Sequence, residues 1–159
     1  MLTSSMSATR TPADPRVTVQ YAVPRKGLPA ATRFRGWARA TLARAASVTL
    51  RIVDEDEGRT LHHTYRGKDY ATNVLTFVYS EEEPLAGDIA LCAPVVAREA
   101  RAQSIALDAH YAHLTVHGFL HLQGYDHTDD RGAAVMEARE SRIMMELGFA
   151  DPYREAEDA

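Results

Sequence analysis

The segment from Asp108 to Gln123 constrains the fold more than any other part of the sequence, because its helical pattern is apolar nearly all round. Apolar side chains stand on most of its faces, namely Tyr111, Leu114, Val116, Phe119, Leu120 and Leu122. A helix of this kind is expected in the protein interior. We therefore predict a buried central helix.

Four histidines, His110, His113, His117 and His121, fall on one narrow stripe of this helix at 100° per residue. Buried imidazoles need partners, because an uncompensated polar group costs a few kcal/mol. Metal binding is one way to satisfy such a row.

The stretch HGFLHLQGYDH contains a metal-binding pattern. His117 and His121 stand four positions apart and point to one side of the helix. Gly124 is expected to end the helix, since glycine enters a left-handed cap without strain, and the chain can then return His127 to the same side. Three histidines with an open coordination position predict a Zn²⁺ site, one ion per chain, although nickel or copper would also bind in vitro.

Gly118 stands where a metallopeptidase has a glutamate that takes the proton of the metal-bound water. Glycine cannot act as a base. The sequence therefore argues against a peptidase and leaves other metal-assisted hydrolysis open, since a zinc-bound water becomes a nucleophile near neutral pH.

Periodicity and capping residues predict nine elements. The expected strands are residues 17–23, 47–53, 74–79 and 87–92, and the expected helices are residues 30–46, 54–66, 94–105, 108–123 and 129–147. Early strands followed by late helices are typical of the α+β class.

Length and composition predict one soluble domain. The chain has 159 residues, which suffice for a single core, and its net charge of −4 argues against non-specific coating of nucleic acid. The polar first residues lack the apolar centre of a signal peptide, and no apolar run in the sequence could span a bilayer. Because Cys92 is the single cysteine, no intramolecular disulfide can form. We expect a cytoplasmic protein without membrane contact, with a disordered lead at residues 1–15 and a single catalytic metal-binding domain at residues 16–155.

A second informative stretch, HHTYRGKDYATNVLTF, runs from residue 62 to residue 77. Arg66 and Lys68 could bind a phosphate, because the fork of an arginine matches two phosphate oxygens at once. Asp69 and Asn73 are candidate substrate contacts, and as turn formers they also have an ordinary structural explanation.

Three segments, YRGKDYATNVLTF, GDIALC and HLTVHGFLHLQGYDH, resemble the signature segments of the YbeY family of bacterial metal-dependent endoribonucleases. The resemblance extends over about residues 48–153, and EARESRIMMELGFADPY is similar to the C-terminal helix of the family. It implies that His117, His121 and His127 are zinc ligands and that Arg66 is an essential arginine.

The resemblance also implies a fold and a function. The implied fold is a small mixed β-sheet covered by helices, with the metal in a cleft. Together with the elements predicted above, this gives an α+β fold of about four strands and about five helices, with the metal site at the end of the buried central helix. The function would be cleavage of single-stranded RNA in ribosomal RNA maturation, notably at the small-subunit 3′ end, and in ribosome quality control, with the ribosome or its small subunit as partner. His62, Thr76 and Val78 depart from the residues usual in the family.

The proposed chemistry joins zinc, which polarises the phosphate or its attacking oxygen, to Arg66, which neutralises the developing charge. Asp126 is a candidate to orient a ligand or to form a turn. The sequence does not decide between water and the 2′-hydroxyl as nucleophile. Two other classes stay open: another zinc-dependent hydrolase acting on peptides or small molecules, and a non-catalytic ribosome assembly factor.

Overall fold

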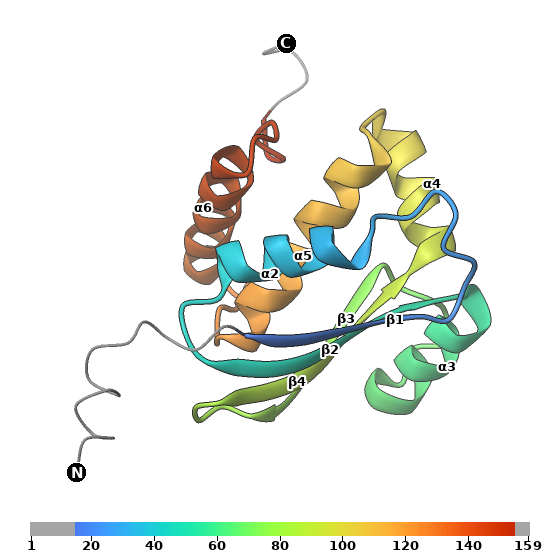
Figure 1. Cartoon of the computed structure of the whole chain (residues 1–159), viewed down its shortest axis with the longest axis horizontal. Coiled ribbons are helices and arrows are strands. Elements are labelled where there is room, and N and C mark those ends of the chain that lie inside the picture. Colours follow the sequence, from blue (N-terminus) through green and yellow to red (C-terminus); the bar gives the residue numbers. More distant parts are fainter. Residues whose placement is uncertain (1–14, 155–159) are drawn as a thin grey trace.

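Residues 15–154 are described by a computed structural model, in which a β-sheet is covered by helices (Figure 1). The strands are β1 (Arg16–Tyr21), β2 (Ala46–Val53), β3 (Val74–Ser80) and β4 (Leu85–Cys92), and the helices are α2 (Ala31–Thr41), α3 (Glu55–Arg66), α4 (Ala93–Gln103), α5 (Leu107–Leu122) and α6 (Asp130–Glu146). The predicted disordered lead, residues 1–15, lies outside the described residues apart from Pro15. None of the helices in the described range is both long and apolar enough to cross a membrane.

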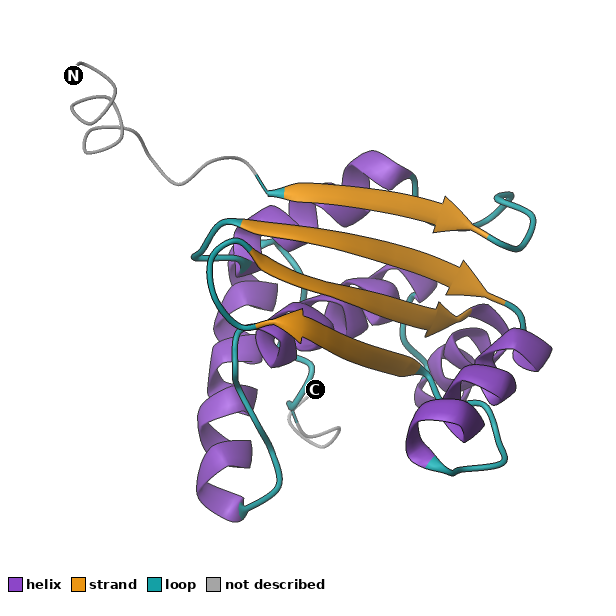
Figure 2. Cartoon of the chain, turned by 90° about the horizontal axis from the view of Figure 1, so that it is seen from below, coloured by secondary structure: helices purple, strands orange, loops and turns teal. Residues whose placement is uncertain are grey.

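The sheet is mixed and has the strand order β1-β2-β4-β3. β1, β2 and β4 run parallel to one another, and β3 pairs antiparallel with β4 at the edge. Figure 2 shows the arrow of the edge strand β3 pointing against those of the other strands. Four strands and five helices in the described part of the chain confirm the predicted α+β fold.

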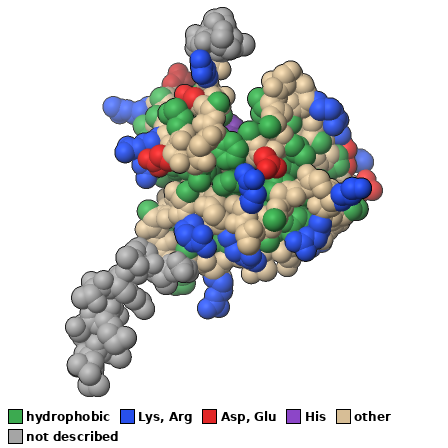
Figure 3. Space-filling model, turned by 45° about the horizontal axis from the view of Figure 1, so that its top comes forward, with side chains coloured by type: hydrophobic (Ala, Val, Ile, Leu, Met, Phe, Trp, Pro, Cys, Tyr) green, Lys and Arg blue, Asp and Glu red, His purple; other side chains and the backbone are tan. Residues whose placement is uncertain are grey.

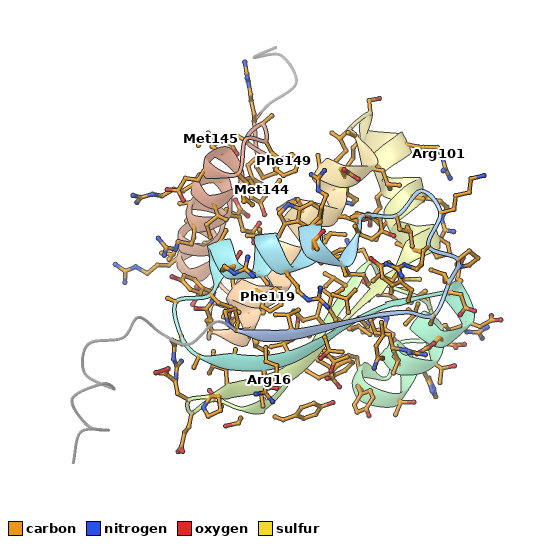
Figure 4. All side chains as sticks on the ribbon, viewed as in Figure 1. Arg16, Arg101, Phe119, Met144, Met145 and Phe149 are labelled. Atoms are coloured by element: carbon orange, nitrogen blue, oxygen red, sulfur yellow. The ribbon has the colours of Figure 1, made fainter. Side chains whose placement is uncertain are left out.

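One face of the sheet forms the main core. Val48, Leu50 and Ile52 occupy every second position of β2 and are at most 2% exposed. They therefore point to the same, covered face of the sheet. α2 and α5 lie over this face (Figures 1 and 2). The Phe119 side chain of α5 is fully buried between the helices and the sheet (Figure 4). The prediction of a buried central helix is confirmed, since α5 contacts α2, α4, α6, β3 and β4.

The helix predicted at residues 30–46 is wrong at its C-terminal end, because α2 stops at Thr41. Beyond Thr41, the side chain of Gln123 at the end of α5 takes the place of the backbone hydrogen bonds that a longer α2 would make. Its Nε2 donates to the carbonyl of Thr41 at 2.9 Å, and its Oε1 accepts from the backbone nitrogen of Ala43 at 3.0 Å. Because this contact joins residues far apart in the chain, the local sequence around Thr41 does not predict where α2 ends. The other element boundaries lie within two residues of the predicted ones.

Gly87 allows β4 to pass under α5. A Cβ atom at this position would overlap the carbonyl oxygen of Phe77 and would lie 2.5 Å from Cδ1 of Leu122. The close approach of β3, β4 and the end of α5 therefore depends on the absence of a side chain. These three elements carry or border the site described below.

We expect Gly87→Ala to lower the free energy of unfolding by about 1–3 kcal/mol, because overpacking displaces both the strand and the helix. The measurement is thermal or urea unfolding. Gly36→Ala in α2 is the matched control, since a Cβ there meets nothing within 4 Å, and a helical Gly→Ala change stabilises by up to about 1 kcal/mol. A melting temperature of Gly87→Ala equal to or above that of the parent protein would contradict this account.

Candidate metal centre

Three histidines converge at the C-terminal end of α5. His117 and His121 belong to α5, and His127 belongs to the loop before α6. One ligand nitrogen from each lies within 4.8 Å of the other two, and the Nε2 atoms of His121 and His127 are 3.3 Å apart. Imidazole nitrogens this close together could share one metal ion. The structure thus brings the three predicted ligands to one place.

Local backbone geometry returns His127 to the helix. Gly124 adopts a left-handed conformation with φ of +100°. Its backbone nitrogen donates to the carbonyl of His121 at 3.0 Å, and that of Tyr125 donates to the carbonyl of Leu120 at 3.1 Å. The chain therefore reverses within one turn of the helix end, as the position of the glycine predicts.

A buried carboxylate, Glu140 of α6, holds the histidine row from behind. Oε2 of Glu140 lies 2.6 Å from Nδ1 of His117, and Oε1 lies 2.7 Å from Nε2 of His113. The hydroxyl of Tyr153 donates to the same carboxylate. Because Nδ1 of His117 donates to Glu140, Nε2 of His117 is left as its ligand nitrogen. Carboxylates in this position orient a metal-binding histidine and raise its basicity.

The electrostatics of the site favour metal-binding protonation states. Desolvation is the largest influence on Glu140 and raises its pKa, but three hydrogen bonds outweigh it and bring the pKa from 4.5 to about 2. Glu140 therefore stays ionised at neutral pH although its side chain is fully buried. Desolvation, followed by the neighbouring His117 and His127, lowers the pKa of His121. A lowered pKa favours the neutral imidazole, which is the form that binds metals.

Sequence reasoning missed Glu140, although a signal for it exists. Along α6 the buried side chains are Met136, Glu140, Ile143 and Met144, and Glu140 thus occupies a core position in an apolar pattern. A charged residue at such a position needs a partner. The opposing helix offers that partner in its histidine row.

The three histidines line an open cavity of about 530 Å³. Arg66, the last residue of α3, and Lys68, just after it, line the same cavity. Both side chains are exposed, and neither forms an ion pair or a hydrogen bond with another residue of the described range. The C-terminus of α3 is capped by Gly67 in a left-handed conformation, so Arg66 is not needed as a cap. Two cations beside a candidate metal centre could bind an anion.

The other predicted contact residues are already engaged. Asn73 lines the cavity, but its Nδ2 donates to Glu99 at 3.0 Å and its Oδ1 accepts from the backbone nitrogen of Val74 at 2.6 Å. Asp126 also lines the cavity and accepts from the backbone and the hydroxyl of Thr128, as a turn residue does.

Asp69 is not brought into the cavity. Its carboxylate is held by Arg59, with Nε of Arg59 2.8 Å from Oδ1 and a second contact of 3.1 Å. Both side chains are exposed on the outer side of α3 and its following turn. Of the four residues predicted as ligand-orienting or substrate contacts, Lys68 alone faces the cavity with an unengaged polar group.

Gly118 faces the sheet and not the cavity. A Cβ atom at this position would lie 3.1 Å from Cδ1 of Ile89 on β4 and 3.4 Å from Oγ1 of Thr76 on β3. An acidic side chain at this position would have to displace the core. The structure therefore gives a packing reason for the missing glutamate.

A three-histidine cluster in a cation-lined cavity of an α+β protein is typical of metal-dependent hydrolases with anionic substrates. Residues 30–148 match the family model described as Endoribonuclease YbeY. The chain therefore belongs to the YbeY family of endoribonucleases, which are nucleases of the hydrolase class.

Individual relatives agree with this assignment. Endoribonuclease YbeY of Methylobacillus flagellatus is 62% identical over 135 residues, which cover 85% of this chain and 91% of the relative. Endoribonuclease YbeY of Stenotrophomonas maltophilia is 54% identical over 156 residues, which cover 91% and 97%. A solution structure of a Thermotoga maritima protein, 24% identical, shares the fold with a TM-score of 0.59 over 87% of this chain and 99% of that one.

We expect Glu140→Gln to weaken Zn²⁺ binding by about 10- to 100-fold, because a neutral amide neither orients His117 nor raises its basicity as a carboxylate does. Competition with a chromogenic chelator measures the affinity. Glu146→Gln is the matched control, since Glu146 lies on the same helix and pairs with Arg142 at the surface. Equal zinc affinity in a folded Glu140→Gln variant would show that the carboxylate serves packing alone.

Proposed function

We propose that this chain is a zinc-dependent, single-strand-specific endoribonuclease that acts in ribosomal RNA maturation, notably at the 3′ end of small-subunit RNA, and in ribosome quality control. One observation carries the proposal: the three-histidine cluster, Arg66 and Lys68 line the same cavity. Membership in an endoribonuclease family supports RNA as the substrate. We place the activity in the cytoplasm, on the ribosome or its small subunit, and assign it to residues 16–155 as a single catalytic domain.

The donor set fits zinc. His117, His121 and His127 would hold the ion, and three neutral nitrogens with one open position are a common catalytic zinc arrangement. When bound, the ion would supply a Lewis acid for the phosphate and for the attacking oxygen. Within residues 15–154 no fourth protein ligand joins the cluster, which argues against a purely structural zinc.

Arg66 is the proposed catalytic residue. Its planar guanidinium can bind two oxygens of a phosphate and can neutralise the negative charge that develops on them during cleavage. Lys68 adds a second positive charge at the same wall. Asn73 and Asp126 shape the cavity through the hydrogen bonds that hold them. The attacking group is a water molecule or the 2′-hydroxyl of the RNA itself, and both fit this assignment.

The test separates the proposal from its two rivals. Purified protein, with and without chelator, is offered a structured RNA with a single-stranded tail and, separately, a casein-type protein substrate. We expect cleavage within the tail, none of the casein, and loss of cleavage on chelation or in His121→Ala, which excludes a contaminating nuclease. Protein cleavage would favour another hydrolase. Metal binding without any cleavage would favour an assembly factor.

We expect Arg66→Ala to lower RNA turnover by about tens- to thousands-fold, the effect of losing one well-placed donor to a developing oxyanion. Arg66→Lys should recover little, since a point charge does not replace a two-pronged contact. Zinc content should stay near one per chain in both variants.

Arg59→Ala is the matched control, because Arg59 lies on the same helix, outside the cavity, and pairs with Asp69. It should leave turnover unchanged. Parallel measurements of rate, bound zinc and melting temperature check these expectations. Normal turnover in zinc-loaded Arg66→Ala would remove Arg66 from the mechanism.

A further inference from the structure

A second cavity, of about 500 Å³, adjoins the metal cavity. Asn73, Val74 and His117 line both, so the two hollows share a wall. The second cavity lies between α4, α5 and the segment after α6. Figure 3 shows a hollow between the α6 side and the α4 side of the molecule, with histidine surface at its floor. A chain-like substrate bound at the metal centre can therefore continue directly into the second cavity.

Among the polar groups that line this cavity, Glu99 of α4 is held in a fixed position by two neighbours. Oε1 of Glu99 lies 2.8 Å from Nε2 of His110 and accepts from Nδ2 of Asn73 at 3.0 Å. The His110 side chain is 5% exposed, and its Nδ1 is buried without a partner among the described residues. His110 thus directs its remaining ring nitrogen at Glu99. The Glu99 side chain is one-third exposed, and its two oxygens, one of which is also 3.3 Å from Nδ2 of Asn73, keep acceptor capacity for a ligand.

The fixed carboxylate of Glu99 determines which ligand groups can bind beside it. The carboxylate repels a phosphate placed against it, and Arg154 is a cation that also lines this cavity. The carboxylate accepts hydrogen bonds from amino groups, and glutamate reads the amino group of cytosine in this way. A uracil presents a carbonyl oxygen at the same position, and that oxygen is repelled.

The remaining walls suit a flat ring. Ile105 is 40% exposed, and Pro152 lies with it in the wall, with the buried Leu114 and Met144 behind. Tyr153, also 40% exposed, adds an aromatic ring. A base in contact with apolar and aromatic side chains gains about 1–3 kcal/mol in single-stranded nucleic acid binding. The cavity volume is in the range that holds small ligands.

We propose that the second cavity is a nucleobase subsite, in which Glu99 selects a base with an amino group on its pairing edge over uracil. The subsite receives the base of a nucleotide beside the phosphate at the metal centre. This inference rests on the proposed RNA substrate and adds base selectivity to it.

The test compares short labelled oligocytidylate and oligouridylate of equal length, because cytosine and uracil differ at the amino group and homopolymers remove any uncertainty of register. Fluorescence anisotropy on protein in excess chelator measures binding without cleavage. We expect oligocytidylate to bind about tenfold more tightly, the effect of one specific contact to a base edge. The zinc-loaded protein should show the same preference in kcat/KM.

Glu99→Gln should bring the two affinities to within about twofold, while Glu55→Gln, an exposed acid paired with Arg98 outside both cavities, should leave the preference intact. An oligomer of N4,N4-dimethylcytidine, which lacks the amino hydrogens, should bind the parent protein like oligouridylate, and this arm needs no variant.

Equal binding of both homopolymers by the parent protein would overturn the subsite. So would a uniform loss of affinity in Glu99→Gln, which would mean that Glu99 acts only by holding Asn73. Either result would leave the endoribonuclease proposal standing if RNA is still cleaved. Failure to cleave any RNA would instead overturn the proposed function, and the subsite with it.

Discussion

The arrangement of the metal centre depends on the hydrogen bonds between the carboxylate of Glu140 and the histidines of α5. The carboxylate lies fully buried on α6 and is satisfied by His113 and His117 of α5 and by the hydroxyl of Tyr153. An ionised carboxylate pays a large desolvation penalty unless several donors surround it. These hydrogen bonds therefore favour the observed packing of α6 on α5, which brings the donors to the carboxylate. The same packing fixes the ring of His117 with Nε2 free for a metal.

The histidines along α5 have different partners: some contact the carboxylates of Glu99 and Glu140, and others form the candidate metal cluster. At its N-terminal end His110 holds Glu99 of α4, in the middle His113 contacts Glu140, and at its C-terminal end the ligand cluster opens to the cavity. One helix thus supports two adjoining cavities, of which the first is lined by Arg66 and Lys68 and the second by the fixed carboxylate of Glu99.

Features that depend on neighbouring residues could be predicted from the sequence, whereas features that depend on contacts between distant residues could not. The buried α5 and the converging histidines follow from spacing and from Gly124, because an i, i+4 pair and a glycine cap act within a few residues. The early end of α2 depends on Gln123, which is distant in sequence, and Asp69 is removed from the site by Arg59. Glu140 interrupts an apolar pattern on α6, yet its partners become evident only when two helices are packed together.

The position of Gly118 links the packing of the core to the chemistry of the cavity. Its Cα faces Ile89 and Thr76 of the sheet, so the helix position next to the first histidine has no room for an acid. Charged groups for a substrate must then come from the opposite wall, and there the end of α3 offers Arg66 and Lys68. Cations in place of a carboxylate stabilise an anionic substrate and the charge that grows on it during reaction. Close packing between α5 and β4 therefore accounts for the glycine that stands beside the first histidine.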